Sequence, residues 1–136
     1  MNVVYYDYNI PHFNLRIITM NSEIIINDTP QCLILVYINY NSSLELSEIT
    51  PGVYFFSRLI VPLKNRRKGI ATILMREMLL YLSKKKNFVK IELGINPYGD
   101  MSYADLKNFY MKYGFVVNEQ NELGEMFELT KDNIIL

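Results

Sequence analysis

Few of the residues that build metal sites and disulfides are present in this chain. Its 136 residues include one cysteine, one histidine and no tryptophan. The lone cysteine, Cys32, excludes an intrachain disulfide and a cysteine metal cluster, and the lone histidine, His12, excludes a multi-histidine metal site. A single histidine also weakens any Ser–His–Asp catalytic scheme. We therefore predict no metal cofactor, and we expect a buried Cys32 thiol because Leu33, Ile34 and Leu35 follow it.

An excess of charge of one sign is also missing. Lys and Arg together number 14, Asp and Glu also number 14, and the formal net charge is 0. A dedicated nucleic-acid binder usually has a basic excess, so we expect no nucleic-acid partner. The N-terminus lacks the basic and long apolar regions of a signal peptide, and the apolar runs are too short to span a bilayer. These absences predict a cytoplasmic protein with no membrane partner.

The chain does contain enough apolar residues, 50% of the total, to form a packed core. Its length predicts a single domain over residues 1–136. Residues 1–61 show the alternation and turn chemistry of strands, whereas 67–85 carry apolar residues at helical spacing. A strand over 88–95, a short helix after Ser102 and two closing strands follow. This order predicts an α+β domain with a mixed sheet and helices packed against it.

The most informative stretch is a short basic loop between a predicted strand and the long predicted helix. An apolar run ends at Pro62, the loop carries Arg66, Arg67 and Lys68, and Gly69 opens the helix. The first N–H groups of a helix have no intrahelical partner and lie at the positive end of its dipole, which favours anions. Glycine also lets an anion approach the backbone closely. The loop thus predicts an anion site; the alternative is a solvated basic turn before an ordinary helix.

Two segments together resemble the GNAT acyltransferase superfamily. The run Arg66-Arg67-Lys68-Gly69-Ile70-Ala71 fits the Arg/Gln-x-x-Gly-x-Gly/Ala signature for acyl-CoA, and Leu59-Ile60-Val61-Pro62 resembles the strand and proline before it. The later run Phe109-Tyr110-Met111-Lys112-Tyr113-Gly114-Phe115 looks like the family's Leu/Phe-Tyr-x-Lys-x-Gly-Phe motif. The resemblance covers roughly residues 53–130, with the expected elements between the two motifs. It implies acetyl-CoA as cosubstrate.

The resemblance also implies which residues hold the cofactor. The loop backbone would bind the CoA pyrophosphate, and Arg66 and Lys68 would add positive charge. The end of the preceding strand would pair its backbone with the pantetheine arm. Where the family often has Asn before the motif tyrosine, this chain has Tyr103, and Asn108 is the substitute for that polar contact. The cofactor-binding residues expected on this basis are Leu59, Ile60, Val61, Arg66, Arg67, Lys68, Gly69, Ile70, Ala71, Thr72 and Asn108.

Catalytic roles follow from the same resemblance. Tyr110 occupies the position of the family's tyrosine general acid, which protonates the leaving thiolate. The family often carries a base, Glu, on the strand before the signature, but residues 53–58 contain no carboxylate. Glu92 on the next predicted strand is the best local replacement; Glu45 and Glu48 are weaker candidates, and ordered water is a further alternative. The alternative for Tyr110 is a core aromatic, and for Glu92 a surface carboxylate.

Taken together, the resemblance implies a GNAT-like sheet that is mixed but mostly antiparallel. Two parallel central strands would splay apart, helices would flank the sheet, and the family's early helical pair is reduced or absent because no amphipathic helix precedes residue 66. The implied function is acetyl transfer to a primary amine, either a small molecule or a protein lysine or N-terminus. A non-catalytic CoA-binding or interaction module is the alternative. The protein is expected to be a monomer or homodimer.

Overall fold

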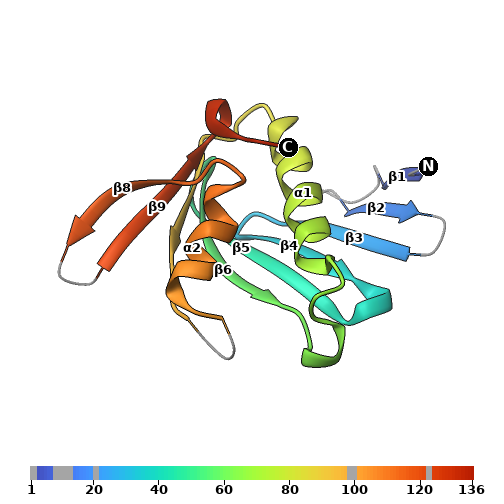
Figure 1. The fold of residues 1–136 in the computed structure, drawn as a ribbon. Coiled ribbons are helices and arrows are strands. Elements are labelled where there is room, and N and C mark those ends of the chain that lie inside the picture. Colours follow the sequence, from blue (N-terminus) through green and yellow to red (C-terminus); the bar gives the residue numbers. More distant parts are fainter. Residues whose placement is uncertain (1–2, 8–13, 20–21, 98–100, 122–123) are drawn as a thin grey trace.

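A computed structural model describes residues 3–7, 14–19, 22–97, 101–121 and 124–136. His12 therefore lies outside the described residues. Two helices and nine strands are present in the described residues (Figure 1). The strands are β1 Val3–Asp7, β2 Asn14–Thr19, β3 Ser22–Asp28, β4 Cys32–Tyr37, β5 Ser42–Thr50, β6 Val53–Ile60, β7 Lys90–Gly94, β8 Val116–Asn121 and β9 Gly124–Thr130. The helices are α1 Ile70–Ser83 and α2 Tyr103–Met111, with short 3-10 turns η1 Ile38–Tyr40, η2 Leu63–Asn65 and η3 Lys131–Asn133.

The strands form one sheet in the order β1-β2-β3-β4-β5-β6-β7-β9-β8. All neighbours are antiparallel except β6 and β7, which are parallel because the chain returns through α1 between them. The predicted mixed, mostly antiparallel sheet with flanking helices is confirmed. Neither α-helix of the described chain is long and apolar enough to cross a membrane.

The parallel strands β6 and β7 separate after a short stretch of pairing. Their register runs from Val53 opposite Lys90 to Phe55 opposite Glu92. Strand β6 then continues to Ile60, paired with β5 alone. The backbone of β6 beyond Phe55 therefore has no strand partner on the β7 side in the described residues. We call the point where the two strands part the fork; it confirms the predicted splayed central strands.

A bulge lies just beyond the fork on β6. Glu45 of β5 pairs with Arg58, whereas the adjacent Leu46 pairs with Phe56, so Ser57 is the extra residue. The bulge shifts the alternation of β6 by one position. Phe56 and Leu59 therefore both turn toward the core, although three positions separate them along the chain.

The hydrophobic core lies on one face of the sheet, and both α-helices cover that face (Figure 1). Buried side chains alternate with half-buried ones along β4 and β5, as expected for strands with one covered face. Fully buried core residues include Ile26, Leu35, Leu44, Ile91 and Phe127 from strands and Leu74, Met75, Met78 and Leu79 from α1. We call the other face, to which Glu45, Arg58 and Glu92 point, the open face, because neither α-helix of the described chain lies on it.

The first half of the chain is β-structure, as predicted. In the described residues before α1 the only helical elements are the 3-10 turns η1 and η2, which agrees with a reduced early helical pair. The predicted buried Cys32 thiol is wrong. Cys32 is half-buried on the open face, where its Sγ donates to Glu45 Oε1 at 3.3 Å. Burial and this hydrogen bond raise the pKa of the thiol to about 11, so it stays protonated at neutral pH.

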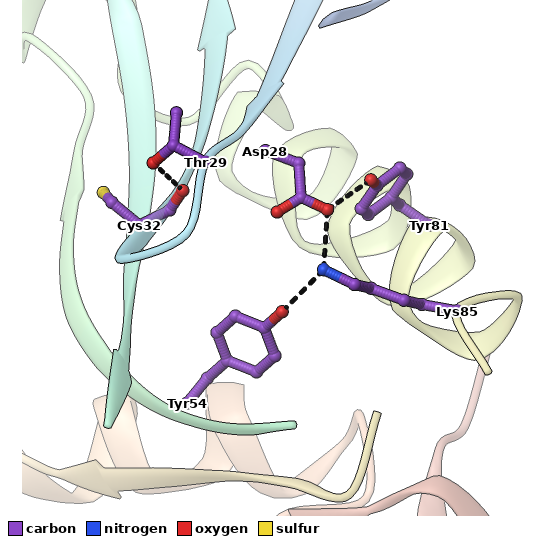
Figure 2. A network of polar contacts seen from close by, with 6 residues as sticks. All are labelled: Asp28, Thr29, Cys32, Tyr54, Tyr81 and Lys85. Atoms are coloured by element: carbon purple, nitrogen blue, oxygen red, sulfur yellow. Dashed lines mark hydrogen bonds and ion pairs between the residues drawn. The ribbon is translucent and has the colours of Figure 1, made fainter. Parts of the chain in front are cut away.

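A buried polar network ties the C-terminal end of α1 to the sheet (Figure 2). Asp28 Oδ2 accepts from Tyr81 Oη at 2.5 Å and from Lys85 Nζ at 2.7 Å. Lys85 Nζ also donates to Tyr54 Oη at 3.0 Å. Burial acts to lower the pKa of Lys85, but the bonds to Asp28 and Tyr54 outweigh it and raise that pKa. The helix is thus fixed at the end opposite its basic loop.

Removing Lys85 is expected to destabilise the fold strongly. The Asp28 side chain is only 8% exposed, so Lys85→Met leaves a buried carboxylate without its cation, at a cost of about 3 kcal/mol. Urea unfolding of the wild type and of Lys85→Met measures this loss of stability. Arg58→Met is the matched control, because the Arg58 side chain is 59% exposed and its ion pair with Glu45 contributes less than about 1 kcal/mol. Equal losses in the two variants would contradict a dominant role for the buried pair.

Candidate cofactor loop and active site

The backbone of the basic loop alternates between positive and negative φ. Arg66 is extended, Arg67 has φ 64°, and Gly69, which directly precedes α1, has φ 76°. Lys68 between them is not among the positive-φ residues. Where successive residues have opposite handedness, their N–H groups can turn toward one side and bind an anion. Because Arg67 adopts a conformation that is unfavourable for a residue with a side chain, the loop holds local strain of the kind found at functional sites.

The start of α1 adds to the positive potential of this loop. Gly69 supplies no side-chain cap, and no acidic residue lies in the first turn. The N–H groups of that turn therefore point out of the helix with the dipole behind them. Arg66, Arg67 and Lys68 are exposed, so their charges face solvent. A Cβ added at Gly69 would meet no atom of the chain within 4 Å. The described chain thus leaves room for at least a methyl group beside this backbone.

Asn65 fixes the loop to the η1 turn between β4 and β5, a role that no sequence pattern predicted. Its side chain is buried, and Nδ2 donates to the carbonyl of Tyr40 at 2.7 Å. Arg66 Nε donates to the carbonyl of Val61 at 3.0 Å, which closes the turn on itself. Ser42 Oγ donates to the same Tyr40 carbonyl at 3.0 Å. No local sequence pattern predicts this hydrogen bond of Asn65, because its partner lies 25 positions earlier in the chain.

Asn65→Ala is expected to weaken cofactor binding more than its effect on folding alone implies. The substitution frees the basic loop from Tyr40 and removes a buried hydrogen bond, which lowers the stability by about 1–3 kcal/mol. Calorimetry with CoA should show affinity reduced about tenfold. Ser42→Ala is the control, because it removes the other bond to the same carbonyl without touching the loop. If Ser42→Ala weakens CoA binding as much as Asn65→Ala does, the proposed anchoring role of Asn65 is contradicted.

Tyr110 lies at the fork, on the helix-covered face. Its ring packs edge-on against Phe56, the first β6 residue beyond the fork, at 5.5 Å between centroids. Phe109 and Phe115 complete an aromatic cage at 5.2 Å and 5.8 Å. Burial raises the pKa of Tyr110 to about 12, so the phenol is protonated at every physiological pH. A protonated phenol can donate a proton or a hydrogen bond, and the family resemblance implies that role for Tyr110.

Glu92 lies at the same fork but on the opposite face of the sheet. It is the last β7 residue paired with β6, and it alternates with the buried Ile91 and Leu93. Its Oε1 contacts Lys90 Nζ at 3.1 Å, and Lys90 also contacts Glu128. The fork therefore has a phenol on one side and a carboxylate on the other. Glu45, the weaker candidate, is paired with Arg58, and Glu48 lies on the helix-covered face opposite Tyr54.

The remaining residues that were expected to bind the cofactor differ in how deeply they are buried. Leu59 and Val61 are partly buried against the core, whereas Ile60 is exposed at 46%. Ile70 is buried at the start of α1, and Ala71 and Thr72 are half-buried in its first turn. Asn108 is exposed on α2. The structure thus gathers the strand end, the loop and the first turn of α1 in one region.

The glycine of the late motif has a clear structural role. Gly114 follows α2 with φ 108°, and a Cβ there would lie 1.9 Å from the carbonyl oxygen of Asn133. The C-terminal segment packs here, and the N–H of Ile135 donates to the carbonyl of Tyr113 at 2.9 Å. At the other end of α2, Ser102 Oγ accepts from the N–H of Asp105, as predicted for its cap. These contacts position Tyr110 at the fork.

Comparison with solved structures identifies this arrangement. An N-acetyltransferase, PaiA, from Thermoplasma acidophilum in complex with coenzyme A matches with a TM-score of 0.59 and 21% identity. The match covers 74% of this chain and 61% of that protein. The chain has the GNAT fold. A GNAT acetyltransferase from Elizabethkingia anophelis with acetyl-CoA bound matches with a TM-score of 0.56 and 16% identity, over 74% of this chain and 76% of its own.

A third GNAT-fold structure that matches is the spermidine/spermine N-acetyltransferase of Vibrio cholerae. It has a TM-score of 0.54 and 21% identity, over 74% of this chain and 65% of that one. This chain therefore spans less than two thirds of the length of two of these three GNAT-fold proteins. No protein-family model and no curated protein matches the sequence. The GNAT fold of this chain thus rests on its three-dimensional structure.

Proposed function

We propose that this chain is an N-acetyltransferase that uses acetyl-CoA to acetylate a primary amine. The observation that carries the proposal is the juxtaposition of an anion-binding loop with a fork. The strained, basic loop leads into α1 directly after the strand that parts from its neighbour, and Tyr110 lies at the fork. GNAT-fold structures with coenzyme A or acetyl-CoA bound support acetyl-CoA as the cosubstrate.

In this proposal the loop and the fork hold different parts of the cofactor. The N–H groups from Arg67 to Thr72 bind the pyrophosphate, and the charges of Arg66 and Lys68 add attraction. The backbone of β6 at Leu59 and Ile60 has no strand partner on the β7 side in the described residues. Together with the adjacent Val61, it hydrogen-bonds the pantetheine arm as an added strand would. Asn108 on α2 supplies a further polar contact. Acetyl-CoA provides the activated acyl group, and the chain supplies binding, orientation and proton transfer.

The proposed reaction is direct transfer at the fork. The nitrogen of a neutral amine attacks the thioester carbonyl, a C–N bond forms, and the C–S bond then breaks. Tyr110 donates a proton or hydrogen bond to the leaving sulfur. Glu92 accepts the proton that the amine loses, directly or through water. Both groups lie at the fork, on opposite faces, so Tyr110 and Glu92 can act on different atoms of the reacting thioester and amine.

Two measurements test this function. Acetyl-CoA should raise the melting temperature, because a ligand at 100 times its Kd adds about 2.7 kcal/mol of stability. Incubation of a cell lysate with isotopically labelled acetyl-CoA, followed by mass spectrometry, should give acetylated amines. An unchanged melting temperature at saturating acetyl-CoA argues against the whole proposal. Cofactor binding without any acetylated product above background favours the alternative, a non-catalytic CoA-binding module.

A further inference from the structure

We propose that Glu125 is a positioning residue, which sets the place of the Tyr110 hydroxyl at the fork by holding the start of α2 against β9. This inference rests on the proposed function, because it concerns how the proposed proton donor is oriented. It joins three observations: the contacts between Glu125 and α2, the exposure of the start of that helix, and the way in which the Tyr110 side chain is held.

The carboxylate of Glu125 accepts from two side chains that lie one turn apart on α2. Its Oε1 accepts from Tyr103 Oη at 2.6 Å, and both of its oxygens accept from Lys107 Nζ at 3.0 Å. Residues four positions apart lie on one face of a helix, so both side chains can reach the same carboxylate. We call this contact between Tyr103, Lys107 and Glu125 the clamp.

The protonation states of the clamp suit these hydrogen bonds. The hydrogen bond to Glu125 raises the pKa of Tyr103 to about 12, so the phenol keeps the proton that it donates. The hydrogen bonds from Tyr103 and Lys107 lower the pKa of Glu125, so the carboxylate is ionised at neutral pH. The Glu125 side chain is only 20% exposed, which shields the clamp from solvent more than an ordinary surface ion pair.

Strand β9 provides the base of the clamp. Glu125 alternates with the fully buried Phe127 and Leu129, so its side chain projects to the face that α2 covers. Lys107 Nζ also lies over the Phe127 ring, 5.8 Å from its centroid. Phe127 in turn pairs with Leu93 of β7, which is one of the two strands of the fork. The clamp therefore ties the start of α2 to the direct neighbour of a fork strand.

The apolar contacts of α2 are concentrated toward its C-terminal end. Within this helix, all of which is described, Tyr110 alone is buried. Leu106 and Phe109 are partly buried against the core, whereas residues 103–105 in the first turn are exposed. The start of α2 thus depends on the clamp for its attachment to the sheet, while its end is held by aromatic packing.

The orientation of α2 determines where the Tyr110 hydroxyl lies. Phe56 and Phe115 hold the ring, but no hydrogen bond of the hydroxyl is found among the described residues. Tyr110 follows Tyr103 by seven positions, about 10 Å along the helix axis. A helix that is released at its start can tilt about its packed end and displace the hydroxyl. A displacement of about 1 Å can lower the rate about 100-fold.

Glu125→Ala is expected to lower kcat about tenfold and to leave the Kd for acetyl-CoA within about threefold. The acceptor probes are spermidine and a peptide with one free lysine, and the release of CoA thiol is measured. Lys85→Met is the control: it destabilises the fold away from α2, so its kcat should match the wild type when both are folded. Unchanged kcat in Glu125→Ala overturns the inference.

A double-mutant cycle separates positioning from a general structural effect. In the Tyr110→Phe background, which lacks the hydroxyl, Glu125→Ala should lower kcat by less than about twofold. The reason is that the clamp acts on catalysis through that hydroxyl. Equal losses of kcat in the two backgrounds overturn the inference, because they show that Glu125 supports the enzyme independently of the Tyr110 hydroxyl.

A spectroscopic measurement tests the clamp without an acceptor. With isotope-labelled tyrosine, the Tyr110 signal is the one that disappears in Tyr110→Phe, and the rings of Phe56 and Phe115 influence its chemical shift. The signal should move in Glu125→Ala and stay in place in Lys85→Met. An unmoved signal in Glu125→Ala overturns the inference whether or not an amine is acetylated. If acetyl-CoA binds and neither the probes nor the lysate is acetylated, the proposed function fails, and the Tyr110 signal alone decides whether Glu125 positions the ring.

Discussion

Gly69→Glu is expected to abolish acetyl-CoA binding, with a loss of affinity of at least 100-fold, about 3 kcal/mol. Gly69 has φ 76° and directly precedes α1. A glutamate there places a carboxylate beside the proposed pyrophosphate site, where like charges repel in a region of positive helix dipole. Calorimetry with CoA measures the loss of affinity. Thermal melts show whether the ligand still raises the melting temperature.

Gly69→Ala is the matched control for backbone strain. Both variants place an L-residue at a positive φ, at a cost of about 1 kcal/mol to folding. An alanine Cβ meets no atom of the chain within 4 Å, so packing adds no further penalty. The two variants should therefore have similar stability without ligand, while alanine retains most of the affinity. Wild-type affinity in Gly69→Glu would exclude this loop as the pyrophosphate site.

Tyr110→Phe is expected to reduce turnover by about 100-fold while leaving acetyl-CoA affinity within about threefold. The substitution keeps the ring contacts with Phe56 and Phe115 and removes only the hydroxyl. No hydrogen bond of that hydroxyl is found within the described residues, so the fold should lose less than about 1 kcal/mol. Steady-state kinetics and calorimetry separate the two effects. Turnover equal to wild type would remove Tyr110 from the chemistry.

The pH dependence of stability offers an independent check on the Tyr110 environment. Burial raises the pKa of Tyr110 to about 12 from a usual value near 10. The native state thus keeps the proton over a range in which the unfolded state loses it. Stability from this group is complete below pH 10 and declines as the pH rises toward 12. The decline should be shallower in Tyr110→Phe; identical slopes would indicate a solvated phenol.

Local patterns in the sequence predicted both α-helices and the position of the basic loop between a strand and a helix. The apolar spacing of Leu74, Met78 and Leu82 placed α1 with its buried stripe, although the helix is shorter than expected at both ends. Ser102 marked the start of α2 because a cap acts over a few residues. The order strand, basic loop, glycine and helix suggested an anion site, because glycine and the helix dipole act locally.

Pairing between strands that are distant in the sequence determined the features that local patterns did not predict. The segment around Glu45 forms β5 because neighbouring strands on both sides pair with it. Cys32 followed an apolar pattern, yet register placed it on the open face. The bulge at Ser57 and the fork after Phe55 depend on how β6 matches two different partners. None of these features has a signal within a short window of sequence.

The sequence by itself determined that a basic loop with a glycine leads into a helix and that a tyrosine motif follows later. Both depend on residues adjacent in the chain, where backbone conformation and charge act over a few ångströms. Only the tertiary structure decided that Tyr110 and Glu92 lie on opposite sides of one fork, that Asn65 anchors the loop, and that both α-helices lie on the same face of the sheet. Those facts arise from contacts between distant segments, whose free energy is set by packing and strand register.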